Sequence, residues 1–504
     1  MSGETPPVRA GAQIARGVSW KLATQVVTQV TRLVVALILA RLLAPAEFGI
    51  AALALVFTSL VHLFSEFGGY SALIQSQEQT EEDRCTVFWI SCALGVVACG
   101  GGIILAGPIA GFFGEPQVRP MFIVLSFTFF LTTATTTTSA ILNRAMAFRR
   151  IEIASMVGVV CGAVAGIAIA FTGGGAWAII LQQVVNSVVY LGLLWFATHW
   201  RPKFIFSRAS ARKTMRFSAN LTGAGVLAYV QKNIDNLLIG RFIGAAPLGV
   251  YSLSYNLMLN PVTRLADPLT QSLFPVLARI QDDDERIASI WLRATRLAAA
   301  IVTPAMVGLV ILAPEFVDTV LGPKWADAVP VIQFLSCVGI VYTLNTVTWG
   351  VALAKGLSGQ LLRLTLAGTA MTVAGILVGL SRGIEAVAAG VAVGVVLQLP
   401  LHVELGARAL GIRRARYWRA VGPVAAATLG MAAVLVPLRR LFTESGFAAP
   451  AVLVCGVAAA AACYIALCLL SPSLRREVAE VTGLARERFR RRGPVLEVAA
   501  TSPK

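Results

Sequence analysis

Long hydrophobic runs separated by short polar stretches dominate the pattern along this chain. Fourteen runs are long enough for a helix to cross about 30 Å of hydrocarbon, which takes roughly 20 residues. Apolar and polar positions do not alternate within them, so helices are favoured over barrel strands. The predicted spans are residues 17–43, 47–74, 85–112, 118–142, 151–172, 175–199, 213–240, 247–276, 289–313, 328–354, 361–381, 384–407, 418–438 and 449–471.

The distribution of basic residues supports this number of spans. With the N-terminus placed in the cytoplasm, 32 of the 42 Lys and Arg residues fall in cytoplasmic segments and three lie inside spans. Cytoplasmic loops of membrane proteins carry such an excess of positive charge, and a wrong count would mix the two sides. We therefore predict fourteen spans with both termini in the cytoplasm. The basic residues on the opposite side are Arg41, Arg119, Arg241, Lys324, Arg382, Arg439 and Arg440.

Composition agrees with a membrane protein and removes nucleic acid as a partner. The chain is 57% hydrophobic and 13% charged, whereas soluble domains carry roughly 25% charged residues. Its net charge is +17, but the basic runs 201–216 and 486–493 lie at predicted cytoplasmic membrane ends. Such runs set the topology and contact anionic lipid headgroups. The polar N-terminus and the long run after it predict a retained first span, not a cleaved signal.

Neither the cysteines nor any nucleotide motif indicates an enzyme. The eight cysteines lie in apolar runs without a CxxC pattern, and Cys85, Cys92 and Cys99 share one helix face at seven-residue spacing. We interpret them as small hydrophobic residues that pack helices, and we predict no metal site. No Walker A motif is present, which argues against direct use of ATP.

A repeat relates the two halves of the chain. Residues 37–54 (LILARLLAPAEFGIAALA) align without a gap on residues 237–254 (LLIGRFIGAAPLGVYSLS) after a shift of 200 positions. Arg41 then falls on Arg241 and Gly49 on Gly249, and Arg32 falls on Lys232. Spans one and seven begin on the same side, so the repeat is a parallel one of six spans. The predicted domains are 1–200 (spans one to six), 201–417 (spans seven to twelve), 418–472 (the last two spans) and a basic cytoplasmic tail, 473–504.

Polar side chains inside the spans predict a cavity between the halves. Gln25, Gln29 and Arg32 recur at i, i+4 and i+7 on span one, which places them on one helix face. A charge at the bilayer centre costs at least about 2.5–3.5 kcal/mol on insertion scales, so a watery cavity or a partner is implied. In two-bundle transporters the substrate path lies between the bundles. The other residues assigned to this cavity are His62, Glu66, Lys232, Asp235, Asn236, Arg264 and Asp267.

Structural ion pairs remain an alternative explanation for these charges. Lys232 and Asp235 are three residues apart, as are Arg264 and Asp267, and this spacing allows pairing on a helix. Prolines also recur every seven residues on span eight, at Pro261, Pro268 and Pro275. Each proline removes a helix donor, so this span either bends as a gate or holds a static kink.

At these residues the sequence resembles a known family. The resemblance lies in ARLLAPAEFGIAALA (40–54), NIDNLLIGRFIGAAPLGVYSLSYN (233–256) and LNRAMAFRR (142–150), together with the fourteen spans. These features resemble the Wzx-type polysaccharide flippases, in particular the colanic-acid-exporter-like branch. That family belongs to the multidrug/oligosaccharidyl-lipid/polysaccharide (MOP) superfamily, which includes the lipid II flippase MurJ.

The resemblance implies a fold, a cargo and roles for the cavity residues. It implies an all-α polytopic membrane protein with two six-helix bundles in a V and two extra helices. The implied cargo is an oligosaccharide on undecaprenyl pyrophosphate, moved across the bacterial inner membrane toward the polymerase machinery. Arg32, Lys232 and Arg264 are then expected to face the anion, with Gln25, Gln29 and Asn236 beside them. The expected charge-balancing or H⁺- or Na⁺-coupling residues are Glu66, Asp235, Asp267 and His62; no other cofactor is expected.

Two observations keep rival interpretations open. Three cations against three carboxylates make the expected cavity nearly neutral, whereas MurJ-like sites suggest an excess of positive charge. Either some carboxylates are protonated, or sugar hydroxyls matter more than pyrophosphate. A MATE-like ion-coupled exporter of drugs or metabolites shares the architecture but needs an acidic cavity. A polymerase or ligase would need a large outer loop, and residues 313–330 form only a short one.

Overall fold

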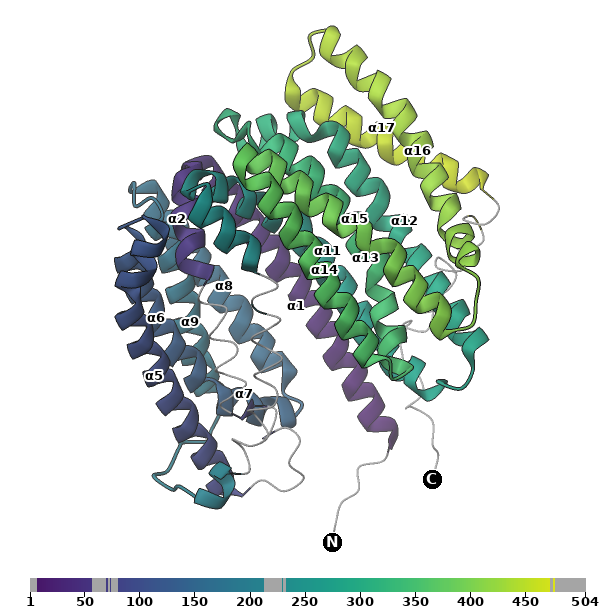
Figure 1. Ribbon diagram of the computed structural model, residues 1–504. Helices are drawn as coiled ribbons and strands as arrows, with labels where there is room; N and C mark the ends of the chain where they lie inside the picture. Colours follow the sequence, from purple (N-terminus) through teal and green to yellow (C-terminus); the bar gives the residue numbers. More distant parts are fainter. Residues whose placement is uncertain are drawn as a thin grey trace, which may run out of the picture. The chain divides into compact units, whose positions relative to one another are not determined.

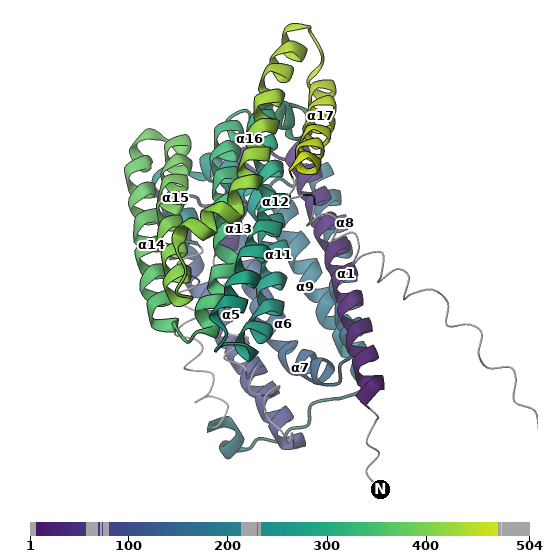
Figure 2. The same cartoon turned by 90° about the vertical axis from the view of Figure 1, so that its right-hand side faces the viewer.

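A computed structural model describes most of the chain as helix. It describes residues 7–56, 69–70, 73, 80–212, 229, 233–471 and 475, and no strand occurs among them. The side chains of 7–23 and most of those between 260 and 275 lie outside this description. Figures 1 and 2 show the helices in two views. The number of fourteen spans remains a prediction, since parts of two of them, 47–74 and 213–240, fall outside the described residues.

The described helices follow the predicted hydrophobic runs closely. Eleven of them are long and apolar enough to cross a membrane, and they coincide with predicted spans one, three to six and nine to fourteen. The helix bounds are α1 (Pro7–Leu42), α2 (Pro45–Val56), α5 (Glu81–Phe113), α6 (Val118–Ala134), α7 (Thr136–Arg144), α8 (Phe148–Phe171), α9 (Trp177–Ala197), α11 (Ala245–Arg279), α12 (Asp284–Phe316), α13 (Ala328–Ala354), α14 (Ser358–Gly379), α15 (Ile384–Ala409), α16 (Arg414–Glu444) and α17 (Ala449–Leu470).

Local signals set the ends of these helices. The Thr80 hydroxyl accepts from the Asp83 N–H, and the Asp83 carboxylate accepts from the Thr80 N–H, which forms a capping box at the start of α5. At the other end of α5, Gly114 has φ of 71°, a left-handed conformation that favours glycine. A short π-helix (Val317–Leu321) continues α12 up to Gly322, where φ is 98°.

The chain divides into two compact units. The first contains residues 1–261, 320–331 and 369–394, and the second contains 262–319, 332–368 and 395–504. These units interleave along the sequence because the first unit takes segments from both halves of the chain, whereas the second takes segments of the second half only. The predicted domains 1–200, 201–417, 418–472 and 473–504 remain a prediction.

Small residues let helices of the first unit approach closely. On α8, Gly158, Gly162 and Gly166 face α9, where a Cβ on Gly162 would lie 2.5 Å from the Gln182 carbonyl oxygen. Such close approach is typical of packing between membrane helices. The last segment of this unit repeats the arrangement, because Gly375 of α14 and Gly390 of α15 meet backbone to backbone. Spans five and six and spans eleven and twelve are equivalent in the predicted repeat, and both pairs pack through glycine.

The second unit is built around α12, α16 and α17, which pack on one another. Trp291 of α12 lies at its centre and is fully buried. The Trp291 indole N–H donates to the Thr348 hydroxyl at 3.2 Å, so the ring is buried without an unpaired donor. Gly406 leaves room for this ring, because a Cβ there would lie 2.6 Å from it. Tyr417 of α16 packs on the indole with ring centroids 5.1 Å apart.

Candidate functional site

The polar stripe predicted on span one lies on α1 and is not sealed inside a bundle. Gln25 and Gln29 are half-buried, and Arg32 is exposed. The buried side of α1 carries Val35 and Leu39 instead, which pack with α8 residues in one hydrophobic cluster. Directly before Gln25, the first residue of the stripe, the Thr24 hydroxyl donates to the Glu152 carboxylate of α8 at 3.2 Å. The cavity role of this stripe remains a prediction.

Most of the other predicted cavity residues cannot be placed. Lys232, His62 and Glu66 lie outside the described residues. Arg264 and Asp267 lie in α11, but their side chains are outside the description. The structure therefore does not bring the three predicted cations together or separate them, and the predicted ion pairs with Asp235 and Asp267 remain untested.

Asp235 has a partner that spacing along the chain did not suggest. The Tyr251 hydroxyl of α11 donates to the Asp235 carboxylate at 2.9 Å, and Tyr251 is fully buried. The Asn236 backbone N–H donates to the other carboxylate oxygen at 2.8 Å. Hydrogen bonds to a carboxylate are stronger than neutral ones, so this contact ties helical residues 233–242 to α11. The neighbouring Asn236 keeps a buried side-chain oxygen without a hydrogen-bond partner.

The two copies of the repeated segment cross each other within the first unit. A Cβ on Gly49 would lie 1.7 Å from the Ala245 carbonyl oxygen, and a Cβ on Gly249 would lie 1.8 Å from the Pro45 carbonyl oxygen. In the repeat Gly49 corresponds to Gly249 and Pro45 to Ala245, so the two contacts are equivalent. This reciprocity is the property of a two-fold contact, in which the same surface is used twice. The starts of α2 and α11 therefore pack on each other about a local pseudo-two-fold axis.

The repeated arginines extend this symmetric junction. Arg41 donates from Nε to the Val320 carbonyl oxygen at 2.8 Å, just before Gly322. Its counterpart Arg241 lies over the Phe112 ring at 5.3 Å, just before Gly114. Each arginine thus contacts the residue two positions before a left-handed glycine that ends a span of the other half. These contacts tie both arginines to the opposite half of the repeat.

The segment after Leu321 holds the junction through Trp325. This fully buried side chain donates from its indole N–H to the Ala40 carbonyl oxygen at 2.8 Å and packs edge-on against Phe48 at 5.3 Å. Lys324 donates from Nζ to the Arg41 carbonyl oxygen at 2.8 Å. Burial lowers the pKa of Lys324, and the nearby Glu47 carboxylate opposes this change. After the side on which the predicted topology places Arg41 and Arg241, we use the term outer junction for Arg41, Gly49, Arg241, Gly249 and Trp325 with these partners.

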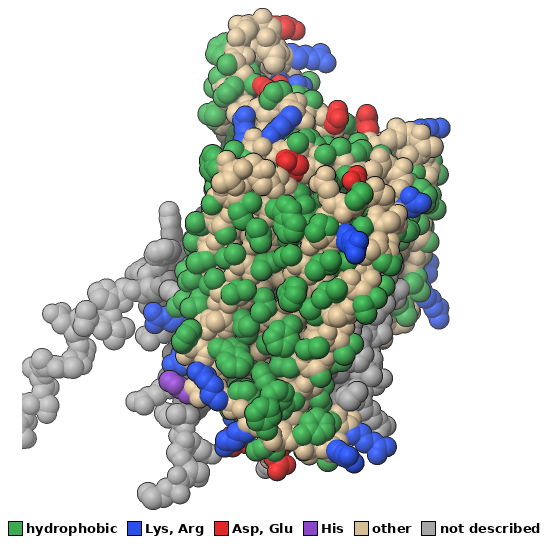
Figure 3. Space-filling model, turned by 90° about the vertical axis from the view of Figure 1, so that its left-hand side faces the viewer, with side chains coloured by type: hydrophobic (Ala, Val, Ile, Leu, Met, Phe, Trp, Pro, Cys, Tyr) green, Lys and Arg blue, Asp and Glu red, His purple; other side chains and the backbone are tan. Residues whose placement is uncertain are grey.

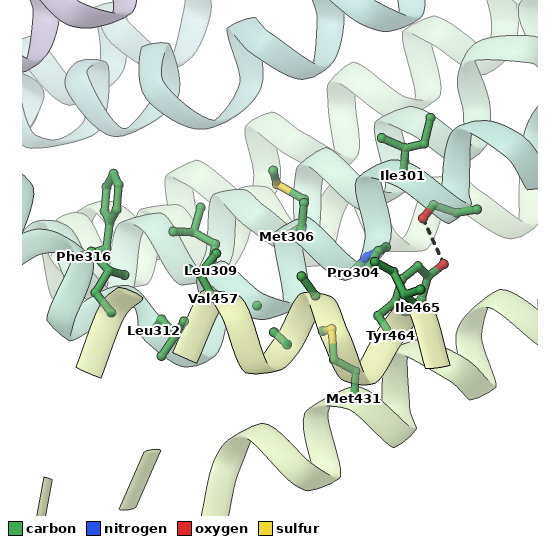
Figure 4. Close-up of a pocket in the computed structure, with 16 residues that line it drawn as sticks. Ile301, Pro304, Met306, Leu309, Leu312, Phe316, Met431, Val457, Tyr464 and Ile465 are labelled. Carbon is green, nitrogen blue, oxygen red and sulfur yellow. Dashed lines mark hydrogen bonds between the residues drawn. The ribbon is translucent and has the colours of Figure 1, made fainter. Parts of the chain in front are cut away.

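The second unit contains an apolar groove between α12 and α17. Its volume is about 580 Å³, and side chains of both helices and Met431 of α16 line it. Figure 4 shows Met306 and Leu309 on one side and Val457 and Ile465 on the other. A pocket of this size with almost no polar group suits an apolar chain rather than a charged ligand.

The one polar side chain among the groove residues is already engaged. Pro304 removes the backbone N–H that would bond to Ala300 four residues earlier. The Tyr464 hydroxyl of α17 donates to this Ala300 carbonyl oxygen at 2.9 Å, as the dashed line in Figure 4 shows. The kink in α12 and the position of α17 are therefore linked by one hydrogen bond.

Sequence reasoning missed several of these residues for a common reason. Tyr251, Trp325 and Tyr464 are aromatic residues in or beside hydrophobic runs, where they are indistinguishable from lipid-facing or core residues. Only Pro304 gives a signal in the sequence, because a proline inside a span leaves a backbone carbonyl that needs another donor. Nothing in the sequence identified Tyr464 as that donor.

Known proteins share this fold. The chain is similar to the solved structure of the lipid II flippase MurJ in an inward closed conformation. The TM-score is 0.73 at 11% sequence identity, over 90% of this chain and 98% of the other. At this identity the similarity shows the fold alone, and it confirms the predicted all-helical, MurJ-like class.

Two relatives and a family model complete the comparison. The lipopolysaccharide biosynthesis protein WzxC of Escherichia coli is 28% identical over 67% of this chain and 69% of its own. The succinoglycan biosynthesis transport protein ExoT of Rhizobium meliloti is 26% identical over 66% of this chain and 67% of its own. A model of the family described as polysaccharide biosynthesis protein matches residues 38–330, more than half of the chain. This multi-pass membrane chain therefore belongs to the polysaccharide biosynthesis protein family, as the resemblance in its repeated segment predicted.

Proposed function

We propose that this protein flips oligosaccharide repeat units linked to undecaprenyl pyrophosphate across the bacterial inner membrane. The observation that carries the proposal is family membership, with a relative named as a transport protein and a helical span pattern throughout. The product would serve the synthesis of an exopolysaccharide, O-antigen or capsule. The cargo would move from the cytoplasmic to the outer leaflet without a covalent step.

The head of such a cargo needs a polar path. Sugar hydroxyls and pyrophosphate charges lose their hydration in hydrocarbon, at a cost of several kcal/mol per unpaired group. Exposed Arg32 on α1, with half-buried Gln25 and Gln29 on the same helix, supports such a path. Lys232, Arg264 and Asn236 are the proposed further contacts to the head.

Carboxylates are proposed to balance these charges or to carry a coupled H⁺ or Na⁺. Asp235 supports this role, since the described side chain that holds its carboxylate is the neutral Tyr251 and not a basic residue. Glu66, Asp267 and His62 are assigned with it from the sequence alone.

The apolar groove is proposed to accommodate part of the lipid tail. Its lining side chains are aliphatic or aromatic, and Tyr464 directs its hydroxyl to Ala300. A polyprenyl chain has no hydrogen-bonding groups, so it gains by burying its surface in such a groove. The tail would then stay in an apolar environment while the head crosses.

Alternating access is the proposed route, with the outer junction opening and closing. The junction joins the two halves of the repeat through a few hydrogen bonds and ring contacts. Rocking of one half against the other around a fixed site is common in transporters with internal repeats. Cytoplasmic termini and an association with polysaccharide polymerase machinery are part of the same proposal.

Gene deletion followed by lipid analysis tests the function. We expect sugar-loaded undecaprenyl pyrophosphate to accumulate in the inner leaflet and surface polysaccharide to disappear, with both restored by the intact gene. A MATE-like exporter would instead leave the lipid pool unchanged and alter sensitivity to cationic drugs. Normal polysaccharide and a normal lipid pool in the deletion strain would contradict the proposal.

A further inference from the structure

The connector that leads out of α9 is fixed along the first turns of α5. Trp89 donates from its indole N–H to the Lys203 carbonyl oxygen at 2.9 Å. The Lys203 N–H points to the Cys85 sulfur at 3.4 Å, and the Ser207 N–H donates to the Thr86 hydroxyl at 2.9 Å. These contacts lie within the first unit, so the backbone of the connector has a defined place there.

Its outer side is aromatic and uncovered. Phe204 is 92% exposed and Phe206 is 58% exposed. A bend at Phe204 separates the two residues, and the Ile205 N–H closes it on the Lys203 carbonyl oxygen at 2.8 Å. Phe204 also stacks on Trp89 with ring centroids 4.7 Å apart. Two large exposed apolar rings on one segment form a surface of the kind that binds an apolar partner.

Exposed cations flank these two residues in sequence. Arg201, Lys203, Arg208 and Arg212 are all exposed within 12 residues. Lys203 pairs with Glu81 at 2.9 Å. Arg201 donates to the carbonyl oxygens of Trp195, Thr198 and Trp200 at and just beyond the end of α9, and it forms no ion pair with a carboxylate of the described residues. The segment therefore carries an excess of positive charge.

The connector lies at the level where hydrocarbon ends. Its contacts Cys85, Thr86 and Trp89 are in the first turns of a candidate membrane span. Beside them, Phe88 packs edge-on against Trp89, Trp195 and Trp200, at 5.3 to 5.9 Å. Such aromatic groups mark the membrane–water interface. Figure 3 shows one face of the molecule with hydrophobic side chains over its middle and Lys and Arg side chains mostly toward its upper and lower ends.

We propose that residues 201–212, the connector surface, bind the headgroups of anionic phospholipids. Phe204 and Phe206 enter the boundary between headgroups and acyl chains, and Arg208 and Arg212 lie against lipid phosphates. An aromatic pair with several cations fits a lipid surface better than a protein partner. The positive charge matches anionic headgroups, and the position of the connector beside the end of a membrane span matches the membrane–water interface. This lipid is distinct from the flipped cargo, because it is a phospholipid of the surrounding bilayer that binds the connector between the two repeats.

The test measures lipids retained by the full-length protein. Protein extracted from vesicles of phosphatidylcholine and phosphatidylglycerol is examined by native mass spectrometry. We expect the wild type to keep phosphatidylglycerol, and Arg208→Gln with Arg212→Gln to weaken that binding by about 30-fold, from the usual contribution of two surface cations. Phe204→Ser with Phe206→Ser should weaken it as well. These exposed positions can change without unfolding the bundle.

Matched variants decide the outcome. Arg382→Gln with Arg440→Gln removes the same charge elsewhere, and Phe171→Ser removes a phenylalanine that is 71% exposed on α8; both should leave lipid binding unchanged. Equal retention in the connector variants overturns the proposal, and so does equal loss in the matched variants. Displacement of phosphatidylglycerol by soluble glycerol phosphate would also overturn it, because the rings would then contribute nothing.

Discussion

Tyr464 shows how one hydroxyl completes a helix that proline has opened. Pro304 leaves the Ala300 carbonyl without its usual donor, and Tyr464 supplies one from another helix at 2.9 Å. In hydrocarbon no water is available to donate a hydrogen bond to an unpaired carbonyl. The contact therefore links the kink of α12, the position of α17 and the groove between them.

Removal of that hydroxyl should destabilise the protein. We expect Tyr464→Phe to lower the free energy of unfolding by about 1–3 kcal/mol, the usual cost of leaving a buried polar group unpaired. Thermal unfolding of the purified protein measures this. In a Pro304→Ala background the restored N–H can bond to Ala300, so the same substitution should cost little. Equal losses in both backgrounds would show that Tyr464 acts only through packing.

Arg32 and Lys232 provide a functional prediction at the same scale. Arg32 is exposed on α1, and Lys232 is its counterpart in the repeat. We expect Arg32→Gln with Lys232→Gln to abolish polymer export while the protein still inserts, because the pyrophosphate would lose two cationic partners. Surface polysaccharide and protein in the membrane fraction are the measurements. Normal polysaccharide in this variant, at a normal protein level, would remove both residues from the cargo path.

At the scale of elements, the crossing of α2 and α11 depends on glycine. A Cβ on Gly49 would meet the Ala245 carbonyl oxygen at 1.7 Å, and one on Gly249 would meet Pro45 at 1.8 Å. Neither contact can be relieved by a flexible side chain, since the obstacle is backbone. The two helices must separate to accept any larger residue.

We therefore expect Gly49→Ala and Gly249→Ala to cost about 1–3 kcal/mol each, as overpacking usually does. Gly100→Ala and Gly101→Ala in α5 provide the controls, because nothing lies within 4 Å of a Cβ at either position. There alanine should be neutral or stabilising by about 0.5–1 kcal/mol. Thermal unfolding separates the two pairs, and similar shifts in all four variants would mean that the crossing is not tightly packed.

The elements could be predicted far better than the contacts between them. Hydrophobic length alone placed eleven described spans correctly, because the bilayer imposes one strict length requirement. The repeat predicted that Gly49 and Gly249 are equivalent but not that their segments touch. Asp235 was considered with Lys232, three residues away, whereas its described partner is Tyr251, sixteen residues away. Tertiary partners of buried polar groups depend on helix packing, which periodicity does not encode.

For the molecule as a whole, transport by alternating access requires the outer junction to open. Phe48 and Trp325 face each other there with ring centroids 5.3 Å apart, from segments almost 280 residues apart in sequence. We expect Phe48→Cys with Trp325→Cys, bridged by a short thiol-reactive cross-linker in a background lacking the eight native cysteines, to stop polysaccharide export. Cleavage of a reducible linker should restore it.

The control pair must share the geometry but lie within one helical hairpin. Phe442→Cys with Phe447→Cys satisfies this condition, since those rings are 5.4 Å apart at the end of α16. A bridge there holds together residues that no rocking motion separates, so export should continue. Export by the bridged junction variant at the rate of the control would mean that this end stays closed throughout the cycle. The cargo would then have to leave by another opening, and the symmetric arginine contacts would be structural only.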